Sequence, residues 1–310
     1  MSEVRRARVR ALAKINLDLR VLGKRPDEYH ELRTIFQTIS LADRLEIGFT
    51  PARKTVIELD DPLGIQDNLV TRAAHLVLQA LRTNGRVAIQ LRKRIPMGAG
   101  LGGGSSDAAA ILLALPALAG KSLSLPAACE IAQQIGSDVT FFLFGGTAVG
   151  IGRGTELFPL PDFPAHSGVL IAPGFPVSTA QAYRDLSSRL TSESQQNKMF
   201  SFQLLVWGGG VSTANDFEAV VFEQHPRLAV LKRKLTRTGA TQAMMTGSGS
   251  AVFGLYRDRN GASRALDRLG DEQAIPFSLV TRTRYRRMWQ QALSPHIEPK
   301  AWPPKSLHSR

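Results

Sequence analysis

A glycine-rich run, residues 96–107, constrains the fold of this chain more than any other segment. Its sequence is PMGAGLGGGSSD. It follows an alternating apolar segment, and its last three residues, from Ser105, begin an Ala- and Leu-rich segment. Successive glycines let backbone N–H groups approach an anion without Cβ atoms in the way, and a helix N-terminus adds a positive dipole end. The run therefore predicts a phosphate-binding turn between a strand and a buried helix.

The run departs from two common nucleotide-binding patterns. Gly98, Gly100 and Gly103 satisfy G-x-G-x-x-G, but no Asp or Glu occurs at 108–129, where a dinucleotide fold needs its ribose-binding acid. No Lys follows the glycines as a P-loop requires, and the protein-kinase signatures His-Arg-Asp and Asp-Phe-Gly are absent. The cation that neutralises a bound phosphate must come from elsewhere in the chain.

Two charged residues in apolar settings are candidates for that chemistry. Lys14 lies in ALAKINL, residues 11–17, and Asp138 lies in GSDV just before the apolar residues 140–144. Buried charges are rare unless they are paired, so each alone would indicate a structural ion pair. Beside a phosphate-binding turn, the two supply the proton acceptor and the positive charge that phosphoryl transfer requires.

Length and composition set the domain organisation. The chain has 310 residues, more than one average core holds, and 43% of them are hydrophobic, as in folded globular proteins. Because residues 158–168 are rich in proline, we expect a boundary there. It separates an N-terminal nucleotide-binding and catalytic domain, residues 1–163, from a C-terminal domain, residues 164–294, and a tail, residues 295–310.

Residue periodicity and turn residues predict most of the secondary structure. Strands are expected at 9–22, 87–95, 169–172, 241–246, 251–256 and 277–283. Helices are expected at 68–81, 105–115, 126–135, 178–190, 217–238 with a break at Pro226, and 262–269. We also expect a strand pair over 32–49, strand and turn over 140–151, and loops at 191–198 and 208–210.

Other features limit the location of the protein. Its single cysteine, Cys129, cannot form an internal disulfide or a thiolate metal cluster, which favours the reducing cytoplasm. The longest apolar stretch, residues 108–119, is shorter than the ~20 residues of a membrane span. The arginine-rich N-terminus lacks the apolar core of a signal peptide. We expect neither a membrane segment nor a cleaved leader.

The formal net charge of +13 suggests polyanionic partners. The basic residues gather at 82–94, 227–237 and 282–287, without the aromatic pattern of an RNA-binding signature. Because of the charge, a basic nucleic-acid-binding protein is the alternative function from a different class. Because that signature is missing, we expect no nucleic-acid partner. We expect Arg92 and Lys93, which precede the glycine run, to raise the local concentration of anionic substrates.

Further segments complete a pattern across nearly the whole chain. They are RPDEYHEL at 25–32, the segment 136–154, PVST at 176–179 followed by Ala182 and Tyr183, NDFE at 215–218, and MTGSGS at 245–250. With the Lys14 segment and the glycine run, they resemble the GHMP kinase superfamily. Glu28 and Thr140 depart from the pattern, which usually has Gly and Pro there, and a Glu at 28 bears on the backbone entering Tyr29.

The resemblance implies an α+β, two-domain fold, with an N-terminal ribosomal-protein-S5-like α/β domain and a C-terminal ferredoxin-like α/β domain. It implies an ATP- and Mg²⁺-dependent kinase that phosphorylates the 2-hydroxyl of a methylerythritol linked to cytidine diphosphate, in non-mevalonate isoprenoid biosynthesis. Another GHMP kinase, of the homoserine or mevalonate type, is the close alternative. The expected partner is this small molecule, and the expected assembly is a monomer or weak homodimer.

The resemblance also implies roles for individual residues. Asp138 would be the general base on the substrate hydroxyl, assisted by Lys14. Tyr29, His30 and Tyr183 would surround the cytosine, with Asn16 nearby, and Gly247 and Ser248 would close over the substrate. The ATP phosphates would lie along the glycine run, at Pro96, Met97, Gly98, Ala99, Gly100, Leu101, Gly102, Gly103, Gly104, Ser105 and Ser106. We expect Ser106 also to contact Mg²⁺.

Overall fold

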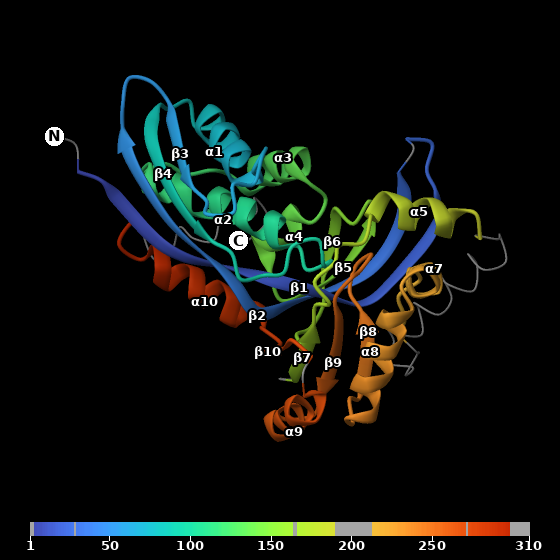
Figure 1. Cartoon of the computed structure of the whole chain (residues 1–310). Helices are drawn as coiled ribbons and strands as arrows, with labels where there is room; N and C mark the ends of the chain where they lie inside the picture. The colour runs from blue at the N-terminus through green and yellow to red at the C-terminus, as the bar shows by residue number, and fades with distance from the viewer. Residues whose placement is uncertain (1–2, 28, 164–165, 190–212, 271, 298–310) are drawn as a thin grey trace.

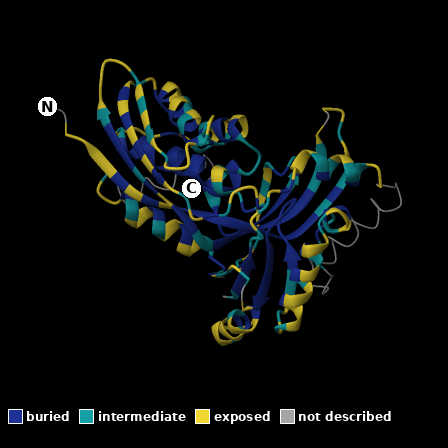
Figure 2. Cartoon of the chain, viewed as in Figure 1, coloured by how far each residue is buried: buried dark blue, intermediate teal, exposed yellow. Residues whose placement is uncertain are grey.

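Two antiparallel-rich sheets with helices packed on them make up the protein (Figure 1). The computed structural model describes residues 3–27, 29–163, 166–189, 213–270 and 272–297. Both sheets are buried where helices cover them, and the outer sides of the helices are exposed (Figure 2). Within the described residues, no helix is long and apolar enough to cross a membrane.

The first sheet has the order β3-β4-β2-β5-β6, and β1 pairs with the free side of β2. Only the β3–β4 pair is parallel. The strands are β1 (Arg5–Lys24), β2 (His30–Pro51), β3 (Val56–Asp60), β4 (Gly85–Arg92), β5 (Thr147–Gly152) and β6 (Glu156–Pro159). Four helices accompany them: α1 (Leu69–Ala80), α2 (Gly103–Leu118), α3 (Leu125–Ile135) and α4 (Val139–Phe144). Strand β4 alternates between buried and exposed residues, so one face of the sheet packs on the helices.

The second sheet has the order β10-β7-β9-β8 and is antiparallel. Its strands are β7 (Ser167–Ile171), β8 (Gln242–Met245), β9 (Val252–Tyr256) and β10 (Ala274–Ser278). The helices described in this half are α5 (Thr179–Ser187), α7 (Glu218–Gln224), α8 (Pro226–Arg237) and α9 (Arg259–Leu269). The last helix, α10 (Arg282–Leu293), instead returns to the first sheet, where Tyr285 and Trp289 join its hydrophobic core.

The long strands β1 and β2 join the two halves. Val9 of β1 packs in the core under α1 and α2, whereas Leu19 and Val21 of the same strand pack with the second half. Leu19 also forms a parallel bridge with Asn215. One pair of strands therefore carries side chains from the first core to the second, and the candidate site develops along it.

Most of the expected elements are present, and three expectations differ from the structure. Residues 32–49 form part of one continuous strand, β2, since no turn interrupts them. Residues 140–151 begin with helix α4, because Phe141 and Phe142 pack into the core beside α2 and the helix stops at Gly145, with φ +63°. Helix α10 lies in a segment expected to hold only the end of a strand.

Several expectations remain open. The loops at 191–198 and 208–210, residue 190 and Glu28 lie outside the described residues, as does the tail from residue 298. The division at residue 163 stays a prediction: it falls between β6 and β7, but β1 and α10 each contribute side chains to the other half's core.

Candidate active site

Lys14 lies on β1 between two irregularities in the β1–β2 pairing. The register shifts between Leu12 and Lys14 and again between Asn16 and Asp18. Such bulges redirect side chains and are common beside active sites. The side chain of Lys14 is 4% exposed, and its ammonium lies 3.4 Å from Asp138 Oδ2. It also lies 5.4 Å from the centre of the Phe36 ring.

Asp138 immediately precedes α4 and has a helical backbone conformation. Its side chain makes no capping hydrogen bond to α4, so the carboxylate is left to face Lys14. The side chain is 30% exposed, whereas that of Lys14 is almost fully buried. The pair thus has one solvent-accessible member, and that member is the carboxylate.

Asn16 connects Lys14 to the second half of the chain. Its Oδ1 accepts hydrogen bonds from Lys14 Nζ at 2.8 Å, Gly247 N at 2.9 Å and Thr246 Oγ1 at 3.1 Å. Its Nδ2 donates to Thr34 Oγ1 at 2.7 Å. Because protein partners occupy both ends of the amide, the structure gives Asn16 a positioning task between the two halves.

The glycine run forms a tight turn before α2. Gly98, Gly100 and Gly102 have φ values of +64°, +77° and +69°, which L side chains rarely adopt. Gly102 precedes the first helical residue, and no side chain caps the helix there. The first N–H groups of α2 are therefore open to an anion at the positive end of the helix dipole.

A loop from the second half, residues 246–250, packs directly on this turn. Thr246 Oγ1 lies 3.3 Å from Gly100 O, and Ala251 N donates to Ala99 O at 3.2 Å. A Cβ on Gly100 would lie 2.2 Å from the carbonyl oxygen of Thr246. Ser248 Oγ lies 2.8 Å from Thr179 Oγ1 and is nearly buried. The loop thus meets the glycine run, backbone against backbone.

Asn215 holds that loop, a role that its sequence motif did not indicate. Its Nδ2 donates to Met245 O at 2.8 Å and to Gly247 O at 2.7 Å, and its Oδ1 accepts from Phe217 N. Asn215 is 30 residues from Met245 and 32 residues from Gly247 in the chain, so the spacing in the sequence gives no signal for these contacts.

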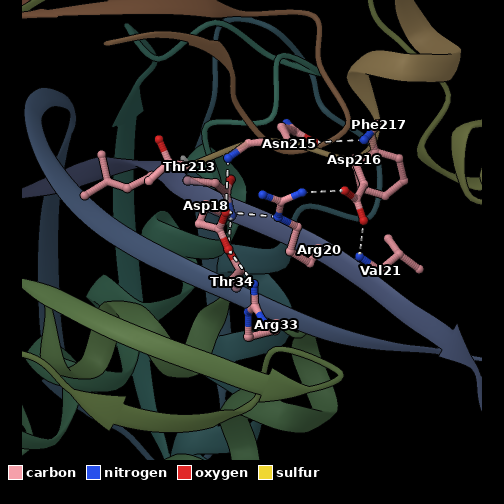
Figure 3. A network of polar contacts seen from close by, with 12 residues as sticks. Asp18, Arg20, Val21, Arg33, Thr34, Thr213, Asn215, Asp216 and Phe217 are labelled. Atoms are coloured by element: carbon pink, nitrogen blue, oxygen red, sulfur yellow. Dashed lines mark hydrogen bonds and ion pairs between the residues drawn. The ribbon is translucent and has the colours of Figure 1, made fainter. Parts of the chain in front are cut away.

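A polar network fastens the Asn215 segment to β1 (Figure 3). Asp18 Oδ1 accepts from Ala214 N at 3.1 Å, and its Oδ2 receives Arg33 Nη2 at 3.2 Å. Asp216 Oδ2 accepts from Val21 N at 2.9 Å, and Arg20 lies between the two carboxylates. Charges from both halves compensate one another here, so the end of β1 is fixed to the segment that holds the loop.

Of the three aromatic residues expected around a base, two stack on each other and the third contacts an arginine. His30 and Tyr183 stack with ring centres 4.6 Å apart and planes inclined by 19°. Burial raises the pKa of Tyr183, and the nearby charge of Asp138 raises it further. Tyr29 is 50% exposed and lies instead against the guanidinium of Arg153, 3.4 Å from the ring centre. The stacked pair is therefore within reach of the Asp138 charge through Tyr183, whereas the Tyr29 ring contacts Arg153.

The expectation that Lys93 attracts substrates from solvent is wrong. Its side chain is 7% exposed, and its ammonium contacts the buried carboxylates of Asp43 and Asp107. Asp43 also accepts from Ile95 N at 2.8 Å. Lys93 therefore anchors the start of the glycine run from within. Arg92 is exposed and pairs with Asp60 at 2.8 Å.

Ser106 is used by the fold. Its hydroxyl is 2% exposed and donates to Leu12 O at 2.7 Å, which ties α2 to β1. The geometry thus assigns Ser106 to helix packing, facing away from the surface of the turn. Among the described residues, no group of three His, Cys, Asp or Glu side chains could hold a metal ion.

Comparison with known proteins identifies the class. The family pattern described as "GHMP kinases N terminal domain" matches residues 68–146, and that described as "GHMP kinases C terminal" matches residues 199–275. The chain belongs to the GHMP kinase family, and its α+β, two-domain fold is the fold of that family.

One relative is 4-diphosphocytidyl-2-C-methyl-D-erythritol kinase of Solibacter usitatus, 64% identical with full coverage of both chains. A crystal structure of 4-(cytidine 5'-diphospho)-2C-methyl-D-erythritol kinase is 38% identical with a TM-score of 0.73, covering 88% of this chain and 98% of that one. Homoserine kinase from Cytophaga hutchinsonii is 16% identical with a TM-score of 0.66, covering 89% and 95%, and shares the fold alone.

Proposed function

We propose that this chain is an ATP-dependent kinase that phosphorylates the 2-hydroxyl of 4-diphosphocytidyl-2-C-methyl-D-erythritol in non-mevalonate isoprenoid biosynthesis. The observation that carries the proposal is the Lys14–Asp138 pair beside a glycine-rich turn at an uncapped helix N-terminus. Lys14 N donates to Leu101 O of that turn at 3.0 Å. The relative named for this activity is 64% identical over the whole chain. In this proposal, a general base, Asp138, lies beside the glycine run that binds phosphate.

In the proposed reaction, Asp138 accepts the proton of the substrate hydroxyl. The hydroxyl oxygen forms a bond to the γ-phosphorus, the bond from that phosphorus to the β-phosphate oxygen breaks, and ADP leaves. Lys14, 3.4 Å from Asp138, supplies a fixed positive charge beside the reacting oxygen. Asn16 holds the ammonium in place.

The glycine run fits a nucleotide triphosphate. Gly98, Gly100 and Gly102 all have positive φ, and a Cβ at each of them would lie closer than 3.0 Å to another part of the protein, so only glycines allow this tight turn. The turn leaves its backbone N–H groups and the N-terminus of α2 to meet phosphate oxygens. Mg²⁺ would then be held chiefly by the nucleotide phosphates, where it neutralises charge during transfer. Ser105, at the start of α2, is nearer to the turn surface than the buried Ser106.

The stacked pair of His30 and Tyr183 supports the cytidine part of the proposal. Aromatic faces bind a nucleobase by stacking, and neither homoserine nor mevalonate carries a ring. With the rings already 4.6 Å apart, the base would stack on the outside of the pair. Tyr29 would reach it only from the exposed turn, and Ser248 would contact the substrate from the 246–250 loop.

The decisive test is Asp138→Asn in the full chain. Loss of a general base lowers turnover by about 10²-fold or more, with the KM for ATP little changed. Asp60→Asn, which removes an exposed carboxylate on β3, is the matched control. Near-normal turnover of a folded Asp138→Asn enzyme would contradict the assignment.

Substrate choice needs its own assay. We expect turnover with the cytidine diphosphate substrate and little with homoserine or mevalonate under the same conditions. A preference for either free alcohol, with no effect of cytidine nucleotides, would favour the other GHMP kinases. A cytoplasmic location and a monomeric or weakly dimeric state stay predictions, the second open to light scattering.

A further inference from the structure

Three arginines lie directly opposite one another across the first sheet. In the β1–β2 register Arg10 faces Arg44, and in the β2–β4 register Arg44 faces Arg92. All three are exposed and alternate with the buried Val9, Leu45 and Leu91. They therefore lie on the face opposite to the one that packs on α1 and α2. Like charges in this arrangement destabilise a sheet.

Few acids offset this row. Arg92 pairs with Asp60, and Arg10 donates to Ser40 O at 3.0 Å. Within the described part of the chain, the Arg44 side chain has no hydrogen bond or ion pair. Glu46, an acidic neighbour on the same face, is paired with Arg8 at 2.8 Å. Arg44 thus carries an uncompensated charge between two others.

Helix α10 adds more arginines to the same place. Arg284 lies in its first turn, where the helix dipole is positive and cations are unfavourable, and Arg287 lies in its second turn. The nearby carboxylate of Asp162 accepts the backbone N–H of Arg282. Among the described residues, no carboxylate forms an ion pair with the guanidinium groups of Arg284 and Arg287. Burial lowers the pKa of Arg10, and Arg44, Arg284 and Arg94 lower it further.

Two hollows meet at Arg10. One, of about 480 Å³, is lined by Arg8, Arg10, Arg44 and Arg92, and the other, of about 510 Å³, by Arg10, Arg284 and Arg287. Both volumes suit a small molecule, since ligand sites usually measure roughly 300–1,000 Å³. Neither lining contains an aromatic side chain, so there is no platform for stacking a base.

We propose that this arginine basin (Arg10, Arg44, Arg92, Arg284 and Arg287) binds a small anion carrying two or more phosphate groups. Arginine is the side chain best matched to phosphate oxygens, through paired N–H donors. An anion centred on Arg10 would neutralise both the cross-strand row and the start of α10. The basin contains no residue of the glycine run and no member of the Lys14–Asp138 pair, so it is a second site, independent of the proposed function.

The test uses inorganic pyrophosphate as the probe and isothermal titration calorimetry on the full chain, with the glycine run saturated by a non-hydrolysable ATP analogue. We expect saturable binding that weakens at least tenfold in the Arg10→Gln/Arg44→Gln double variant. The control, Arg233→Gln/Arg237→Gln, removes two exposed arginines one turn apart on α8, and its affinity should stay within twofold of wild type. Equal losses in both double variants, or no saturable binding, would overturn the proposal.

Two further measurements keep the proposal open to refutation. At low salt without pyrophosphate, Arg44→Gln should melt at a higher temperature than wild type, because it removes like-charge repulsion. A lower melting temperature would contradict the argument. Basin-dependent binding of a single-stranded RNA in the absence of pyrophosphate binding would also overturn it, because the partner would then be a nucleic acid.

Discussion

The ammonium group of Lys14 lies closer to the amide oxygen of Asn16, at 2.8 Å, than to the carboxylate of Asp138, at 3.4 Å. The same amide oxygen accepts the Gly247 N–H from the second half of the chain. Asn16 is therefore the point at which the Lys14–Asp138 pair and the 246–250 loop are aligned with one another.

Asn16→Ala removes three hydrogen bonds to one buried acceptor. We expect kcat to fall by about 10–100-fold, and the free energy of unfolding by about 2–4 kcal/mol, because Lys14 and Gly247 lose their buried partner. Asn215→Ala is the matched variant, since it releases the same loop without touching Lys14. It should mainly raise the KM of the alcohol substrate. If the two variants lower kcat equally, Asn16 acts only through the loop.

Lys93 and Arg92 are adjacent in the chain but should respond very differently to substitution. Lys93→Met leaves two buried carboxylates without their cation and should lower the unfolding free energy by about 3–5 kcal/mol. Arg92→Gln breaks a pair whose members are each 51% exposed, which should cost about 1 kcal/mol or less. Urea unfolding measures both. The Lys93→Met/Asp107→Asn variant should recover part of the loss, and a loss below about 1 kcal/mol for Lys93→Met would contradict the buried cluster.

Asp107 should make stability depend on pH. Burial raises its pKa to about 7 from an ordinary 3.8, and although Lys93 opposes this, the second carboxylate, Asp43, adds to it. A carboxyl whose pKa is raised by folding binds its proton more tightly in the native state. The stability that this group contributes to the folded protein is therefore fully present below the pKa of the unfolded state, near 3.8. It is lost as pH rises through the folded-state pKa of about 7.

The measurement compares wild type with Asp107→Asn between about pH 5 and about pH 8. Over this range the wild type should lose on the order of 1–3 kcal/mol through this group, and the variant should lose correspondingly less. Parallel curves for the two proteins would show that the proton is not held by Asp107. Asp60→Asn, on the surface, is the control for the chemical change itself.

The sequence predicted the parts of the site whose signal is local. The glycine run, the cation inside β1 and the carboxylate before α4 are each visible within a dozen residues, and the structure brings all three together. The basic neighbours of Lys93 conceal its burial, although the alternation of buried and exposed residues in β4, continued one residue past the exposed Arg92, places Lys93 on the inner face. A run of charges does not show which member is buried.

Contacts between distant segments could not be predicted. Asn16 and Gly247 are 231 residues apart, and Asp216 is 195 residues from the Val21 N–H that it binds. Helix α10 did carry a local signal, since Tyr285, Trp289 and Leu293 recur every fourth residue and are buried. The arginines between them hid that stripe, because they make the helix polar on average.

Gly100 and Gly104 lie in the same run but should differ in their tolerance of a side chain. Gly100 has φ +77°, and a Cβ there would lie 2.2 Å from Thr246 O, so Gly100→Ala should cost at least about 2 kcal/mol. Gly104 is helical, and a Cβ there would have its nearest neighbour at 3.7 Å, so Gly104→Ala should gain up to about 1 kcal/mol. Thermal unfolding distinguishes them. Equal losses would mean that the loop does not pack on the turn.

Thr140, a buried residue of α4, offers a stabilising substitution. Its hydroxyl is buried and has no hydrogen-bond partner among the described residues. Thr140→Val keeps the shape and removes the unsatisfied oxygen, so the free energy of unfolding should rise by about 1 kcal/mol. Thr34→Val is the matched control: that hydroxyl donates to Asp18 O and accepts from Asn16, and its loss should cost about 1–3 kcal/mol. Urea titration of both variants decides the question, because a destabilised Thr140→Val would mean that the hydroxyl has a partner, such as a bound water.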